Sequence, residues 1–286
     1  MSFLNNGLQL LIPIGLCLFY GCSQVEKSDG PLDLLALEEP SNDRDWEPAQ
    51  GTLCQASFHE DETVTLHNVR NCLHLDEGNL YVLDHYDKTY DLRKLTTVDF
   101  FLVPFPEMPS MAHTFISFGF EDGEYVAVSV EVRKEKGENY NPLHGMVGQY
   151  ELIYVIGDEK DIVRWRTNEL KNDVYMYRIQ AEQEAVYSLF VDVMERANEL
   201  AEKPEYYHTI KNNCTTNLLE HVNRLYPGRI PYTLEVLMPG YSDRLLYELG
   251  LIRHDEPFAD VKSAAYVTGR AQYYADSPDF SQKIRE

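Results

Sequence analysis

The sequence predicts an α+β fold in which a mostly antiparallel sheet packs against helices. Residues 111–120 and 124–133 are rich in aromatic and β-branched side chains and alternate in polarity, which is typical of paired strands. Strand patterns recur at 151–156 and 174–179. Apolar residues at three- and four-residue steps between Ala181 and Glu202 predict a long helix, which Pro204 ends. A second amphipathic helix is predicted to begin at Cys214 and to pack against the sheet.

The chain begins with a mostly apolar segment, residues 8–21, that runs into Gly21-Cys22-Ser23. This segment is shorter than the roughly 20 residues that span a bilayer, and it suits a secretory signal. Gly-Cys-Ser resembles a lipobox, so we expect a signal peptide over residues 1–22 and lipid attachment at Cys22. That would make the protein a periplasmic or outer-membrane lipoprotein of the cell envelope. An ordinary signal peptide is the alternative, because Tyr20 is large for a lipobox and no basic residue precedes the segment.

Residues 23–50 are polar and acidic and contain three prolines, so we expect an acidic tether there and one large domain over residues 51–286. The chain has 25 Lys and Arg against 47 Asp and Glu, a net charge of -22, and residues 1–22 contribute no charge. Such an acidic domain is not expected to bind nucleic acid. An anionic membrane surface would repel it too, so membrane contact should come from the lipid anchor or from local apolar residues.

Cys214 is the strongest candidate for a nucleophile. Asn213 is a good N-cap, which makes Cys214 the first residue of the helix and puts its thiol at the positive end of the helix dipole. That position favours a thiolate. The alternative is a buried, inert thiol, because Cys214 lies one turn before Leu218 on the apolar face of the same helix.

His113 is the candidate base, on the strand 111–120. If residues 121–123 form a three-residue turn, with Gly123 in the left-handed conformation, Glu131 lies opposite His113 and can orient it. A two-residue turn would send Glu131 to the other face, with Ser129 or Tyr140 as substitutes. We expect the Cys214 thiol within about 4 Å of the His113 ring, and an imidazolium charge that helps to stabilise the thiolate.

Several ordered motifs between Trp46 and Ile252 carry a family resemblance. They are His67-Asn68-Val69-Arg70-Asn71, Tyr90-Asp91-Leu92, Thr96-Thr97-Val98-Asp99, Ala112-His113-Thr114-Phe115, Ser129-Val130-Glu131-Val132-Arg133, Tyr150-Glu151-Leu152-Ile153-Tyr154-Val155 and Asn212-Asn213-Cys214-Thr215-Thr216. Together they resemble the bacterial domain family that forms the N-terminal periplasmic part of the lipoprotein N-acylation protein Lnb. The order of histidine, acidic residue and Asn-Cys is also similar to circularly permuted papain-like folds, including the lecithin:retinol acyltransferase and NlpC/P60 groups.

The resemblance implies a thiol-dependent acyltransferase or hydrolase that acts on an ester or amide carbonyl. Cys214 would attack the carbonyl, His113 would carry the proton, and Glu131 would orient His113. The Cys214 amide, next to the cap Asn213, would help to hold the oxyanion. Acyl lipids, lipoproteins and peptide amides are the candidate substrates. No hydrophobic multi-span half follows the motifs, so lipoprotein N-acylation itself is not implied.

A non-catalytic surface lipoprotein that binds a protein partner is the alternative from a different class, with the 20 tyrosines as contact residues. No cofactor is expected. No metal site is expected either, because the spacing of the histidines between residues 59 and 85 matches no zinc ligand set. Cys17 belongs to the signal, and Cys54 can pair with Cys72 in an oxidising compartment, which would leave Cys214 free. The sequence does not predict the oligomeric state.

Overall fold

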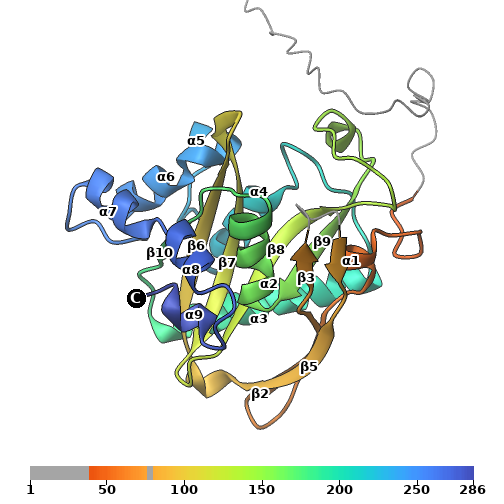
Figure 1. Cartoon of the computed structure of the whole chain (residues 1–286), viewed down its shortest axis with the longest axis horizontal. Coiled ribbons are helices and arrows are strands. Elements are labelled where there is room, and N and C mark those ends of the chain that lie inside the picture. Colours follow the sequence, from red (N-terminus) through yellow and green to blue (C-terminus); the bar gives the residue numbers. More distant parts are fainter. Residues whose placement is uncertain (1–38, 76–79) are drawn as a thin grey trace, which may run out of the picture. The chain divides into compact units, whose positions relative to one another are not determined.

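The computed structural model describes residues 39–75 and 80–286. The expected signal peptide, the lipid site Cys22 and most of the tether lie outside these residues. Within them the fold is α+β, as predicted (Figure 1). The strands are β1 Gln55–Phe58, β2 Thr63–Arg70, β3 Leu73–Leu75, β4 Leu80–Val82, β5 His85–Asp91, β6 Leu95–Phe105, β7 Met108–Phe120, β8 Tyr125–Arg133, β9 Glu151–Gly157 and β10 Tyr175–Arg178.

One large sheet organises the domain. Its strands lie in the order β1-β2-β9-β8-β7-β6-β10, with β5 also paired to β2, while β3 and β4 form a separate two-stranded sheet within the described residues. All neighbours are antiparallel except β2 and β9, which run parallel where Arg70 pairs with Gly157. The mostly antiparallel sheet is therefore confirmed, whereas the circular permutation stays a prediction.

Helices cover both faces of this sheet (Figure 1). On one face, α3 and α4 pack on the larger apolar cluster through Phe190 and Leu219. On the other face, α2, α8 and α9 pack on a smaller cluster that contains Phe101 and Phe115. The helices are α1 Pro48–Gly51, α2 Glu159–Arg164, α3 Gln183–Glu202, α4 Cys214–Leu225, α5 Leu234–Leu237, α6 Ser242–Glu248, α7 Phe258–Ala265, α8 Thr268–Tyr273 and α9 Phe280–Lys283, with short turns η2 Leu92–Lys94, η3 His144–Met146, η4 Trp165–Glu169 and η5 Pro239–Tyr241.

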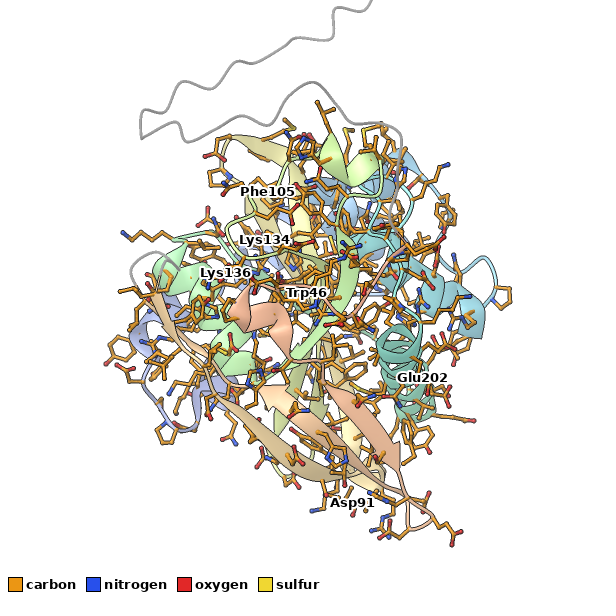
Figure 2. The ribbon with its side chains drawn as sticks, turned by 90° about the vertical axis from the view of Figure 1, so that its right-hand side faces the viewer. Trp46, Asp91, Phe105, Lys134, Lys136 and Glu202 are labelled. Atoms are coloured by element: carbon orange, nitrogen blue, oxygen red, sulfur yellow. The ribbon has the colours of Figure 1, made fainter. Side chains whose placement is uncertain are left out.

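The folded domain begins before residue 51, so the expected tether is wrong at its C-terminal end. Trp46 is buried, and its ring lies 4.1 Å from the guanidinium carbon of Arg133, at the end of β8. The Asn42 side chain donates hydrogen bonds to two carbonyls at the end of α3. Figure 2 shows Trp46 beside Lys134, which follows β8. The polar, acidic composition of this segment predicts a tether. The segment is nevertheless held to the domain, because one buried tryptophan and a few side-chain hydrogen bonds to backbone carbonyls anchor it.

Cys54 and Cys72 are both buried and both free, so the expected disulfide is not present. Gln55 pairs with His67, which puts Cys54 level with Asn68. Cys72 lies four residues further along, about 13 Å away at the usual rise of a strand. A disulfide needs Cα atoms within about 7 Å. Burial raises the pKa of Cys54 to about 12, which makes it an unreactive core thiol.

Candidate functional site

Cys214 is the first residue of α4, as the sequence predicted. The Asn213 side chain accepts a hydrogen bond from the Thr216 amide at 3.0 Å, and the Asn213 amide donates to the Thr216 hydroxyl at 2.8 Å. These two bonds form a capping box, which starts the helix at one defined residue. Cys214 is 8% exposed. Its thiol therefore lies at the positive end of a rigid helix, largely covered by its neighbours.

The hairpin of β7 and β8 has the register predicted for a three-residue turn. The Phe120 amide donates to the Glu124 carbonyl at 2.9 Å, and Gly123 has a φ of +82°, in the left-handed region. Phe115 pairs with Ser129 in the ladder that follows. This register brings the next two candidate residues to the same face of the hairpin.

His113 and Glu131 lie close together, but they are not directly hydrogen-bonded. His113 Nε2 is 3.9 Å from Glu131 Oε1. Ser129 lies between them, with its hydroxyl 2.7 Å from His113 Nε2 and 2.8 Å from Glu131 Oε1. The sequence expected Glu131 to orient the histidine itself, so this detail is corrected: the contact passes through Ser129.

The single proton of the Ser129 hydroxyl fixes the tautomer of His113. A carboxylate only accepts hydrogen bonds, so Ser129 must donate its proton to Glu131. Ser129 can then only accept from His113, which puts a proton on Nε2. In the described part of the chain no hydrogen bond engages His113 Nδ1, so this atom is the one available as a base.

Arg166, in η4, keeps Glu131 ionised. Its guanidinium lies 2.9 Å from Glu131 Oε1, and both side chains are about nine-tenths buried, with exposures of 8% and 10%. Burial acts to raise the pKa of Glu131, but the charge of Arg166, with smaller contributions from Arg70 and the Ser129 hydrogen bond, outweighs it and lowers that pKa. The carboxylate is therefore a stable acceptor for Ser129.

The same surroundings keep His113 neutral. Burial and the nearby Arg166 cation lower the pKa of His113 to about 3, although Glu131 acts in the opposite direction. The expected imidazolium is therefore wrong for the free protein, because a charged ring here would be poorly solvated and close to a second cation. Any role for His113 as a base begins from the neutral ring, with the proton arriving only as the thiol reacts.

Cys214 and His113 approach the sheet from opposite faces, at a point where it opens. The ladder between β7 and β8 ends at the Phe115 and Ser129 pair, although both strands continue. Just beyond this point the Thr114 and Thr215 hydroxyls are hydrogen-bonded at 3.1 Å. Since each threonine directly follows one of the candidate catalytic residues, this bond places the start of α4 beside the part of β7 that carries His113.

The expected direct contact between the thiol and the imidazole is not a hydrogen bond here. The polar contact of Cys214 Sγ is with the hydroxyl of Thr215 at 3.8 Å, and none with His113 is present among the described residues. A catalytic contact would need the thiol to turn from Thr215 towards Nδ1 when substrate binds.

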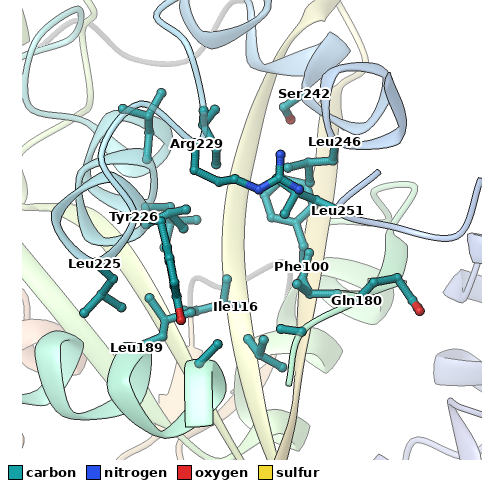
Figure 3. Close-up of a pocket in the computed structure, with 18 of the residues that line it drawn as sticks. Phe100, Ile116, Gln180, Leu189, Leu225, Tyr226, Arg229, Ser242, Leu246 and Leu251 are labelled. Carbon is teal, nitrogen blue, oxygen red and sulfur yellow. The ribbon is translucent and has the colours of Figure 1, made fainter. Parts of the chain in front are cut away.

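An apolar cavity of about 270 Å³ lies beside α4 (Figure 3). The helix that begins with Cys214 contributes the side chains of one face, from Thr215 through Leu218 and Leu219 to Leu225. Strands β6 and β7 supply Phe100 and Ile116 opposite them. The apolar stripe that the sequence assigned to core packing therefore also lines a hollow large enough for part of a ligand.

The family model described as the Lnb N-terminal periplasmic domain matches residues 82–240. This is more than half of the chain, and it includes His113, Glu131 and Cys214. The chain belongs to this family. No curated protein and no solved structure matches it. Membership of the Lnb N-terminal family indicates the periplasm as the location of the domain, and among residues 39–75 and 80–286 no helix is long and apolar enough to cross a membrane.

Sequence reasoning missed two polar residues of the site in this Lnb N-terminal domain. Ser129 was expected only as a substitute for Glu131, and Arg166 was not predicted as a site residue. The alternation of the strand could have revealed Ser129, because it lies two residues before Glu131 on the same face. Nothing local marks Arg166, which reaches the site only because α2 and η4 pack across that face.

Proposed function

We propose that this domain is a thiol-dependent acyltransferase or hydrolase that accepts an acyl group from a lipid ester or lipoprotein. One observation carries the proposal: Cys214 opens a capped helix whose next turns line an apolar cavity. Cys214 does not itself line the cavity, but the next residue, Thr215, does. A nucleophile one residue from such a cavity suits a substrate with a reactive carbonyl and an apolar chain. The neighbouring His113, Ser129 and Glu131 supply the proton-transfer group that a thiol needs.

The reaction would proceed in two halves. Cys214 Sγ bonds to the carbonyl carbon as its proton passes to Nδ1 of His113, and the carbonyl π electrons move to the oxygen. The oxyanion then reforms the carbonyl and expels the alcohol or amine, which takes the proton from His113. In the second half, water or an acceptor amine attacks the thioester carbonyl and gives a proton to His113. The C–S bond then breaks, and the Cys214 thiolate takes the proton back from His113 as the acyl product leaves.

The charge that forms on His113 in each half has a partner. An imidazolium created by proton transfer can donate from Nε2 through Ser129 to the ionised Glu131. Because the resting ring is neutral, this stabilisation is felt only as the reaction proceeds, which is when it lowers the barrier. The positive charge of Arg166 disfavours an imidazolium on His113, so we expect substrate binding to move Arg166 away from His113 or to screen its charge.

Trapping of the acyl-enzyme tests the proposal. Wild-type domain is mixed with a panel of lipid esters and peptide amides, and its intact mass is measured before and after hydroxylamine, which cleaves thioesters. We expect one acyl group per chain from a lipid ester, absent in Cys214→Ala and removed by hydroxylamine. A Cys54→Ala variant is the matched control and should still be labelled. No Cys214-dependent adduct with any member of the panel would refute the proposal.

A non-catalytic binding domain is the second candidate. It is favoured by the low exposure of Cys214 and by the lack of a hydrogen bond from its thiol to His113 within the described residues. This candidate predicts that iodoacetamide modifies Cys214 only after unfolding. Alkylation of the folded protein, followed by peptide mass analysis, separates the two candidates.

We also propose that the domain is tethered to the membrane through a lipid on Cys22. The support is the apolar segment that precedes Gly21-Cys22-Ser23 in the sequence. Metabolic labelling with a palmitate analogue tests this, with Cys22→Ala as the control. Equal absence of label in both proteins would refute lipid attachment and leave export untouched.

A further inference from the structure

A chain of buried polar side chains links α3 to the start of α4 and plays no part in the proposed reaction. Asp192 lies 2.5 Å from Nδ1 of His221, and Nε2 of the same ring lies 2.8 Å from the Tyr154 hydroxyl. The Tyr154 hydroxyl donates to Asn217 at 3.0 Å. His221 is 1% exposed, Asn217 3% and Tyr154 4%, so solvent is excluded from these hydrogen bonds. Such a network is costly to leave incomplete, which makes its geometry well defined.

The donor and acceptor roles of Asn217 and Tyr154 in this network follow from the contacts of Asn217. The amide nitrogen of Asn217 donates to the side-chain oxygen of Asn212 and to the backbone carbonyl of Asn213, both at 2.8 Å. Asn217 Oδ1 is therefore its acceptor, and the single proton of the Tyr154 hydroxyl goes to it. Tyr154 thus ties the Asn217 side chain to the orientation in which it clamps the loop before Cys214.

The other end of the chain is anchored by a charge. The Tyr154 oxygen also lies 2.8 Å from Nε2 of His221, so the ring holds the hydroxyl from the side away from Asn217. Burial acts to raise the pKa of Asp192, but the hydrogen bond and charge of His221, aided by Arg224, lower it, so Asp192 is an ionised acceptor for the Nδ1 proton. Hydrogen bonds engage both ring nitrogens, so the ring cannot turn without breaking a buried bond.

The clamped atom is the carbonyl oxygen of Asn213. It accepts from the Asn217 amide at 3.0 Å, from the Asn217 side chain at 2.8 Å and from the Thr216 hydroxyl at 3.2 Å. This carbonyl and the N–H of Cys214 belong to the same planar peptide group. Three bonds to one end of the plane therefore set the direction of the N–H at the other end, and in the described part of the chain that N–H donates to no other group.

We infer that Asp192, His221, Tyr154 and Asn217 are positioning residues that aim the Cys214 N–H at the oxyanion of the tetrahedral intermediate. The inference rests on the proposed acyl-transfer function and adds the residues that position the donor to its charged intermediate. A preorganised donor of this kind is effective only if it is already aimed before charge develops. The buried network supplies that rigidity through the bonds of Asn217 to Asn212 and Asn213.

Tyr154→Phe tests the inference, because it removes one hydroxyl and keeps the ring. Decanal is the probe: an aldehyde that adds to a thiol forms a tetrahedral adduct with an oxyanion, whereas alkylation by iodoacetamide does not need one. We expect the affinity for decanal to fall about tenfold or more in Tyr154→Phe, while the alkylation rate of Cys214 stays within about twofold. Tyr177→Phe is the matched control, since Tyr177 is also buried and donates to a carboxylate, that of Asp243.

Amide hydrogen exchange supplies a readout that does not depend on the chemistry. The amides of Thr216 and Asn217, which donate to Asn213, should exchange about tenfold faster in Tyr154→Phe and at the wild-type rate in Tyr177→Phe. Unchanged exchange overturns the inference, and so does a parallel loss of decanal affinity and alkylation, which would mean that the whole helix start has moved. If wild-type protein forms no Cys214-dependent decanal adduct, the acyl-transfer function fails and takes the oxyanion role with it, and exchange then reports only whether the network holds the loop.

Discussion

Replacing His113 with glutamine is expected to remove an acid-dependent loss of stability. In the folded protein the pKa of His113 is lowered to about 3, from a value of 6.5 for the free side chain. Below pH 6.5 the unfolded chain therefore binds one proton more than the folded chain. The contribution of His113 to stability is fully present above that pH and falls by about 1.4 kcal/mol for each pH unit below it. Between pH 6.5 and about pH 4 the wild type should lose about 3 kcal/mol that His113→Gln does not lose.

Urea unfolding of both proteins across this pH range, followed by tryptophan fluorescence, measures the difference. Other titrating groups are common to the two proteins and cancel in the comparison. Nitrogen NMR of labelled histidine adds a direct check, because the His113 ring should keep its proton on Nε2 and remain neutral down to about pH 4. A free-energy difference that does not change with pH would refute the description of His113 as a buried, neutral base that is kept so by burial and Arg166.

Three further outcomes are expected. Cys54 and Cys72 should both react with a thiol reagent when protein purified without reductant is unfolded, and failure of both to react would restore the disulfide. Gly240→Ala should lower the free energy of unfolding by about 1–3 kcal/mol, because its Cβ would lie 2.0 Å from a backbone carbonyl oxygen of β7, whereas Gly269→Ala, with open space around it, should be close to neutral in a thermal melt. Leu219→Trp should fill the cavity and lower kcat/KM about tenfold for long-chain esters while short-chain esters react as before, and an equal effect on both would separate the cavity from acyl binding.

The sequence predicted the local parts of the site well because their signals are local. Asn213 as N-cap, the three-residue turn at Gly123 and the strand that carries His113 follow from capping, turn chemistry and alternation, and the structure confirms each of them. The same local rules gave Glu131 its face, since the register of a hairpin follows from its turn. These features depend on residues a few positions apart.

The interactions between these parts of the site could not be predicted, because they depend on contacts between residues that are far apart in the sequence. Arg166 reaches Glu131 because one helical segment packs across the sheet, and its charge is what changes the expected imidazolium into a neutral ring. The Asp192 and His221 pair lies on two helices that meet only in the folded core.

The amino-acid sequence by itself determined the fold class, the family and the placing of a cysteine at a helix start, because periodicity, caps and motifs are written along the chain. Tertiary structure alone decided the protonation state of His113, the position of the Ser129 hydroxyl between His113 and Glu131, and the separation of Cys54 from Cys72. Each of these depends on burial, or on distances between side chains far apart in the chain. Such quantities exist only when the sheet and its helices have packed together.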